Sequence, residues 1–130
     1  MDVLQPDNWP RPRGYSNGIA AEGKVVFVAG QIGWDASGEL VSSDLVVQVR
    51  QALSNIVDVL KEVGAGPNNI TRLTWYVTDK SDYLTRQAEI GAAYRQVIGN
   101  HYPAMSLLVV KDLLEEGAKV EIEATAVVAT

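Results

Sequence analysis

The sequence predicts an α+β fold in which a single sheet carries two helices on the same face. Strand-like stretches outnumber helical ones along the chain, and two amphipathic helices can cover only one face of such a sheet. The opposite face would then carry a mixture of apolar and polar side chains. That mixture predicts that the bare face is buried by self-association, the alternative being a face that tolerates water.

Composition favours one folded domain and excludes several classes of site. The 130 residues are 47% hydrophobic and 21% charged, and the net charge of −5 speaks against broad nucleic-acid binding, which needs cations for the phosphates. The absence of Cys excludes disulfides and thiolate chemistry, and a single His excludes a multi-His zinc site. No apolar run is long enough to span a membrane, and the start lacks the pattern of a secretory signal. We therefore expect a cytoplasmic protein with no membrane partner.

The N-terminal third is predicted to contain an arm followed by the first strands. Residues 1–13 include three Pro and are expected to be an arm, with a single domain over 14–130. Residues 24–30 (KVVFVAG) are predicted to be a strand covered on both faces. Residues 16–21 are expected to pair with it through a turn at Gly23.

Two helices are predicted from apolar residues at helical spacing. The first, over 45–63, begins after Ser43 or Asp44 as N-cap and ends before Gly64. The second opens at Ser81 or Asp82 and continues to about residue 98. The stripes expected to be buried are Leu45, Val49, Ala52, Leu53, Ile56, Val59, Leu60 and Val63 in the first helix, and Leu84, Ala88, Ala92 and Val97 in the second.

Three further strands are predicted over 70–78, 105–110 and 119–129. The last of them alternates, so that Val120, Ile122, Ala124, Ala126 and Val128 can face the helices. The bare face is expected to carry Tyr76, Arg72, Val127 and one set drawn from Met105, Leu107 and Val109.

Few residues stand out as candidates for catalysis or ligand binding. Glu121 and Glu123 lie two apart on a strand and share one face, so they could divide acid and base roles or simply be solvated charges. If that face became an interface, burial would raise the pKa of a Glu unless a cation or donor compensated. His101 and Tyr15 lie in predicted loops. His101 could act as a general base or could simply be a polar surface residue. Tyr15 could contact a ligand or could simply pack against the sheet. No phosphate-binding Gly loop and no Gly-x-Ser-x-Gly motif is present.

Several short motifs, taken in order, resemble the Rid/YjgF family of reactive-intermediate deaminases (the L-PSP type). The resemblance covers about residues 14–128. The motifs are Gly14-Tyr15-Ser16, Val28-Ala29-Gly30-Gln31-Ile32, Gln51-Ala52-Leu53-Ser54-Asn55-Ile56, Thr78-Asp79 with Asp82-Tyr83, Tyr102-Pro103-Ala104, and Val120-Glu121-Ile122-Glu123-Ala124.

This resemblance implies a chorismate-mutase-like fold, a homotrimer with clefts between subunits, and hydrolysis of small enamines or imines without a metal or organic cofactor. By the same resemblance, Glu121 would position or activate the attacking water. Tyr15, Gly30 and Gln31 would line the cleft around a small-molecule ligand. Ala29, Met105 and Leu107 are expected at the other substrate-binding positions.

The chain departs from the family pattern at positions that matter for binding. Met105 stands where deaminating members have an Arg that holds the substrate carboxylate, and Met offers no charge or donor in its place. Ala29 stands where Ser is common, Leu107 where Cys is common, and Gln87 near a common Asn. We therefore expect inefficient turnover of 2-aminoacrylate and similar free amino-acid imines, and a better fit for a larger or less acidic imine, enamine or related electrophile.

Two other readings stay open from the sequence. A trimer that has lost the Arg could bind a small metabolite or a partner without catalysis. RNA cleavage is attached to older descriptions of the family, but the charge of −5 and the lack of a basic stripe argue against it.

Overall fold

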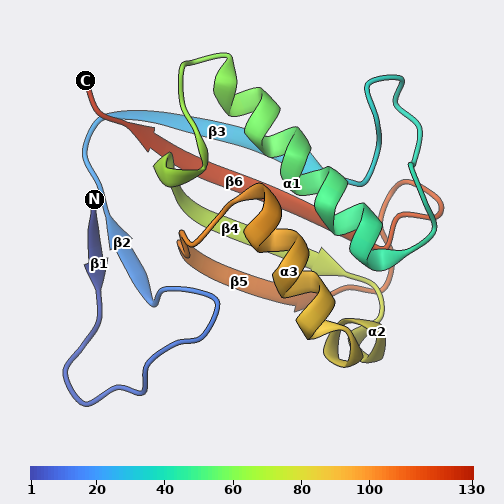
Figure 1. Ribbon diagram of the computed structural model, residues 1–130, viewed down its shortest axis with the longest axis horizontal. Helices are drawn as coiled ribbons and strands as arrows, with labels where there is room; N and C mark the ends of the chain where they lie inside the picture. Colours follow the sequence, from blue (N-terminus) through green and yellow to red (C-terminus); the bar gives the residue numbers. More distant parts are fainter.

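The computed structural model describes all of residues 1–130 and has one four-stranded mixed sheet with both long helices on one face (Figure 1). The strands are β3 (Lys24–Gln31), β6 (Val120–Val128), β4 (Ile70–Val77) and β5 (Ala104–Val109), in that order across the sheet. β6 is antiparallel to both of its neighbours, whereas β4 and β5 are parallel. The α+β prediction, with its helices on one face, is confirmed.

The sheet side of the core comes from the alternation predicted for the last strand. Ile122 is fully buried on β6, and Leu73 is fully buried on the neighbouring β4. Residues at odd positions of β6 are only partly buried and point to the other face. A nonpolar side chain every second residue therefore fixes which face of the sheet meets the helices.

Helix α1 (Leu45–Lys61) begins where a capping side chain is available. The carboxylate of Asp44 accepts a hydrogen bond from the backbone N–H of Val47, 3.1 Å away, which selects Asp44 over Ser43 as the N-cap. A hydrogen bond from Arg86 is the main reason that the pKa of Asp44 is lowered. The helix ends two residues before the predicted end, and Val59 and Val63, predicted to be buried, are each 42% exposed.

The second predicted helix is two helices with a break at Arg86. Helix α2 (Lys80–Thr85) and helix α3 (Gln87–Val97) are separated by the non-helical backbone of Arg86, whose guanidinium contacts Asp44 and Glu89. The predicted stripe is wrong on both sides of the break: Leu84, Ala88 and Ala92 are exposed and Val97 is only partly buried. The buried residues of α3 are Ile90, Ala93 and Tyr94.

The N-terminal arm contains a strand that the sequence did not predict. Strand β1 (Asp2–Leu4) pairs with β2 (Gly18–Ala20) as a separate two-stranded sheet. The prediction that residues 16–21 pair with β3 is therefore wrong, because β3 has β6 as its only partner.

The bare face of the sheet carries both charged and large apolar side chains. Phe27 is 79% exposed and Val25 is 50% exposed on β3, and Arg72 and Tyr76 on β4 also point away from the helices. The prediction for β5 is wrong, because its register pairs Met105 and Leu107 with the buried residues Leu73 and Trp75 and so turns them toward the helices. Ser106 and Leu108 take the bare-face positions.

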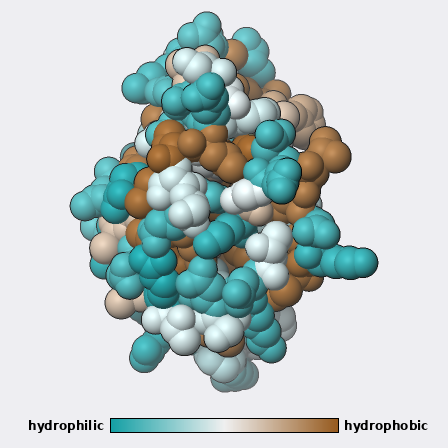
Figure 2. Space-filling model, turned by 90° about the vertical axis from the view of Figure 1, so that its right-hand side faces the viewer, coloured by the Kyte–Doolittle hydropathy of each residue, from teal (hydrophilic) through white to brown (hydrophobic).

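At the end of the molecule where α1 begins, hydrophobic side chains are exposed between hydrophilic ones (Figure 2). None of the helices is long and apolar enough to cross a membrane.

Candidate functional site

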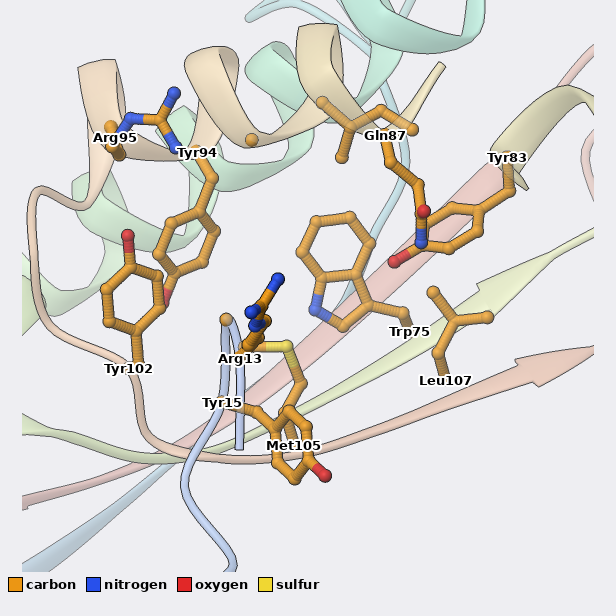
Figure 3. Close-up of a pocket in the computed structure, with 13 residues that line it drawn as sticks. Arg13, Tyr15, Trp75, Tyr83, Gln87, Tyr94, Arg95, Tyr102, Met105 and Leu107 are labelled. Carbon is orange, nitrogen blue, oxygen red and sulfur yellow. The ribbon is translucent and has the colours of Figure 1, made fainter. Parts of the chain in front are cut away.

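A cavity of about 510 Å³ opens between α3 and the β4–β5 edge of the sheet (Figure 3). Most of its wall is aromatic or apolar, and the polar groups at its margin are two guanidinium groups and one amide. The aromatic and apolar side chains are Tyr15, Trp75, Tyr83, Ile90, Tyr94, Tyr102, Met105 and Leu107, and the polar ones are Arg13, Gln87 and Arg95. A few polar groups in an apolar cavity of this size are typical of a small-molecule site.

Tyr15 reaches this cavity because its neighbour is fastened to the chain that leads into β5. The backbone N–H of Ser16 donates to the carbonyl of Pro103 at 3.0 Å, and its hydroxyl donates to the carbonyl of Tyr102. Gly14 has φ +77°, a left-handed conformation that other residues adopt less readily. The N-terminal segment is thereby held against the cavity.

Three stacked aromatic rings form one wall. The ring centroid of Tyr94 lies 6.5 Å from that of Trp75 and 5.4 Å from that of Tyr102. The Tyr94 hydroxyl donates to the carbonyl of His101 at 2.6 Å, and burial raises the pKa of Tyr94 above its ordinary value.

His101 has a structural role in this chain. Its Nε2 lies 2.7 Å from the backbone carbonyl of Ile70, and because a carbonyl oxygen only accepts, that nitrogen must be the donor. The imidazole therefore ties the loop before β5 to the start of β4, and a role as general base is not supported.

The indole N–H of Trp75 has no partner. Trp75 is 3% exposed, and its Nε1 is the only buried side-chain nitrogen or oxygen in the subunit without a hydrogen bond. Leaving such a donor unpaired costs about 1–3 kcal/mol. In Figure 3 the indole nitrogen is on the side of the ring that faces Arg13 and Met105.

The two cations at the cavity are also unpaired. The subunit's ion pairs involve Lys61 and Arg86, and neither Arg13 nor Arg95 takes part in an ion pair or a side-chain hydrogen bond. Both guanidinium groups are thus free to meet an anionic ligand.

The other predicted site residues lie on the bare face of the sheet. The Glu121 carboxylate packs against Gly30 so closely that a Cβ there would lie 2.2 Å from its Oε2. None of the subunit's hydrogen bonds or ion pairs involves that carboxylate. The neighbouring Glu123, in contrast, accepts a 2.8 Å hydrogen bond from the Tyr76 hydroxyl, which is the main reason that the pKa of Tyr76 is raised.

Ala29 lies next to this pair of glutamates. It lines a second, smaller cavity of about 420 Å³ on the bare face, together with Phe27, Arg72 and Glu123. Gln31 is held at the end of β3, where its amide donates to the carbonyl of Ala29 at 3.1 Å and accepts from the Trp34 indole at 3.3 Å.

The predicted site residues therefore form two groups on opposite faces of the sheet. Tyr15, Met105 and Leu107 line the aromatic cavity, whereas Ala29, Gly30, Gln31 and Glu121 belong to the bare face or to the end of β3 beside it. The sheet separates the two groups within the chain.

Sequence reasoning missed most of the aromatic wall. Tyr94 and Arg95 went unnoticed because the helix was given the wrong buried stripe. Gln87, Ile90 and Tyr94 recur at helical spacing, and this was the available signal for the face that lines the cavity.

Comparison with known proteins shows to which family this chain belongs. Residues 9–128 match the family described as Endoribonuclease L-PSP. The chain belongs to the Rid/YjgF family. It is 32% identical to human 2-iminobutanoate/2-iminopropanoate deaminase over 114 residues, covering 87% of this chain and 79% of the human protein.

Solved structures of Rid/YjgF proteins have the same fold. A Rid-family protein of unknown function from Yersinia pestis, YyfB, matches with a TM-score of 0.83 and 34% identity, over 98% of each chain. E. coli TdcF with bound serine matches with a TM-score of 0.70 and 30% identity, over 99% of this chain and 100% of TdcF. In this Rid chain, no cluster of three or more His, Cys, Asp or Glu side chains is placed to hold a metal ion.

Proposed function

We propose that this Rid-family chain forms a homotrimer and hydrolyses an imine or enamine, without a cofactor, at clefts between its subunits. The observation that carries the proposal is the unpartnered Glu121 carboxylate lying against the backbone of Gly30 on the bare face. A relative named 2-iminobutanoate/2-iminopropanoate deaminase supports the reaction class. The serine bound to TdcF supports a small polar ligand.

The division of the predicted site into two groups supports a site shared between subunits. Glu121 and Tyr15 cannot meet one ligand within a subunit because the sheet lies between them. Packing the bare face of one copy against the cavity edge of the next would bring the two groups together. It would also cover Phe27, the most exposed large side chain of the sheet.

The proposed reaction needs only water and one carboxylate. Water adds to the carbon of the C=N bond, and Glu121 accepts a proton from that water as the C–O bond forms. Glu121 passes this proton to the nitrogen, which gives a carbinolamine. The hydroxyl proton of the carbinolamine then also moves to the nitrogen, the C–N bond breaks, and ammonia leaves as the C=O bond forms. Tyr15 and the Gly30 backbone would orient the substrate, with Ala29, Gln31 and Leu107 lining the cleft.

The proposal is tested by assembly and turnover of the purified protein. Light scattering in dilute buffer is expected to give three times the subunit mass of 14.1 kDa. Ammonia release from imines generated in situ by an amino-acid oxidase is expected to exceed the rate in buffer for at least one imine. A well-folded lone subunit would remove the shared cleft and the function with it.

Met105→Arg is expected to raise the rate on small imines such as 2-iminopropanoate. A buried carboxylate that loses its cationic partner costs about 3–5 kcal/mol, and a guanidinium restores part of that term. We expect a gain in kcat/KM on the order of tenfold, with the wild type close to the background rate. Met105→Gln is the matched control, because it adds polarity without charge. Wild-type turnover of 2-iminopropanoate at ordinary enzyme efficiency would contradict this account of Met105.

A non-catalytic trimer that binds a small metabolite or a partner is the second candidate. The apolar residues Ala29, Met105 and Leu107 favour it, since they remove polar groups from the predicted cleft. Ligand binding without ammonia release from any imine would support this alternative.

A further inference from the structure

We infer that the aromatic cavity recognises a ligand that combines an aromatic ring with an anionic or carbonyl oxygen, and that the Trp75 indole N–H donates to that oxygen. As a substrate, such a ligand is an aryl-substituted 2-imino acid, with the corresponding 2-oxo acid as its product. The imine part of this inference rests on the proposed function, whereas binding of the 2-oxo acid does not.

The unpaired indole N–H is the first argument. Interior donors in folded proteins almost always have an acceptor, and Trp75 Nε1 is the one that lacks it here. The ring lines a cavity rather than the packed core alone, so an acceptor can arrive from outside the chain. Met105, a flexible thioether that can move aside for a ligand, lines the same cavity.

The shape and chemistry of the wall are the second argument. Tyr83, Tyr94 and Tyr102 line the cavity beside Trp75, and the volume of about 510 Å³ lies within the range of small-molecule pockets. A two- or three-carbon imine would leave much of this aromatic surface uncovered. A ligand with its own ring can stack or pack edge to face against these side chains.

The unpaired guanidinium of Arg13 is the third argument. It lines the same cavity, as Figure 3 shows. A carboxylate on the ligand can meet Arg13 while one of its oxygens accepts from Trp75. For a ligand whose ring is held by the aromatic wall, this pair of donors from the N-terminal segment and β4 takes the place of the charge that Met105 lacks. The expectation of poor turnover then applies only to imines without an aromatic ring.

The test uses the wild-type protein, ¹⁵N-labelled, with phenylpyruvate and pyruvate as probes that differ only in the ring. The chain has three Trp, so three indole N–H signals are expected, and Trp75→Phe identifies the one from Trp75. Phenylpyruvate is expected to shift that signal downfield and to bind at least tenfold more tightly than pyruvate. Equal affinity for the two probes, or an unmoved Trp75 signal at saturation, would overturn the inference.

Two variants separate the contributions of the hydrogen bond and the charge. Trp75→Phe keeps an aromatic ring but removes the donor, and it is expected to weaken phenylpyruvate binding about tenfold. Arg13→Gln is expected to weaken it by a similar factor and to reduce its salt dependence. Trp9→Phe, which alters an exposed Trp of the arm, is the matched control. Unchanged affinity in a folded Trp75→Phe protein would contradict the proposed hydrogen bond.

The binding assay also distinguishes this inference from the proposed function. Ring-dependent binding with the Trp75 shift, but no ammonia release from the imine of phenylalanine, would support the ligand class and reject the hydrolase. Equal turnover of the alanine and phenylalanine imines, with no preference in binding, would support the hydrolase and reject the ligand class.

Discussion

Replacing Glu121 by Gln is expected to lower kcat/KM for imine hydrolysis by about 100- to 10,000-fold, the usual contribution of a general base. The amide keeps the shape of the side chain beside Gly30 but cannot accept the proton of the attacking water. The rate of ammonia release at saturating and limiting imine concentrations measures the effect. Because the charge is lost rather than the packing, the mass in solution should stay that of the wild type.

Glu123→Gln is the matched control for this prediction. Glu123 lies two residues away on the same face of β6, but its carboxylate accepts a hydrogen bond from the Tyr76 hydroxyl. Its replacement is expected to change kcat/KM by no more than about threefold, within the small effects usual for a side chain outside the chemistry. Equal losses in the two variants would point to a shared role in assembly, and an active Glu121→Gln protein would reject Glu121 as the base.

Replacing Gln48 by Leu is expected to have the largest effect on stability. Gln48 is fully buried in α1, and its amide donates to the carbonyls of Ser42 and Gly117 at 2.8 and 3.0 Å. Its carbonyl oxygen accepts from the backbone N–H of Lys119 at 2.8 Å. Leu fills a similar volume but removes the side-chain partner of three backbone groups and all the polar contacts of a fully buried side chain, so we expect a loss of about 3–5 kcal/mol in the free energy of unfolding.

Denaturant unfolding at equal protein concentration measures this loss. Gln96→Leu on the exposed face of α3 is the control and should change the free energy of unfolding by less than about 0.5 kcal/mol. A Gln48→Leu protein within about 1 kcal/mol of the wild type would show that the three backbone groups find other partners.

The local pattern of the chain was enough for the class of fold. Strand β6 alternates strictly and α1 repeats at helical spacing, so each element identifies its own buried face. The second predicted helix was described less well. Its break at Arg86 goes with a contact to Asp44, far along the chain, which no local pattern indicates. The buried face of α3 did have a local signal, in the spacing of Ile90 and Tyr94.

The candidate site was likewise predicted in part from the sequence and in part only from the tertiary structure. Motifs along the sequence determined the family and named Tyr15, Gly30, Met105 and Glu121, because those residues lie in short segments that can be compared directly. Only the tertiary structure decided that the sheet separates Met105 from Glu121, and that Trp75 turns an unpaired donor toward a cavity. The physical reason is register: the parallel pairing of β4 with β5 sets which side chains face α3, and the sequence of either strand alone leaves that choice open.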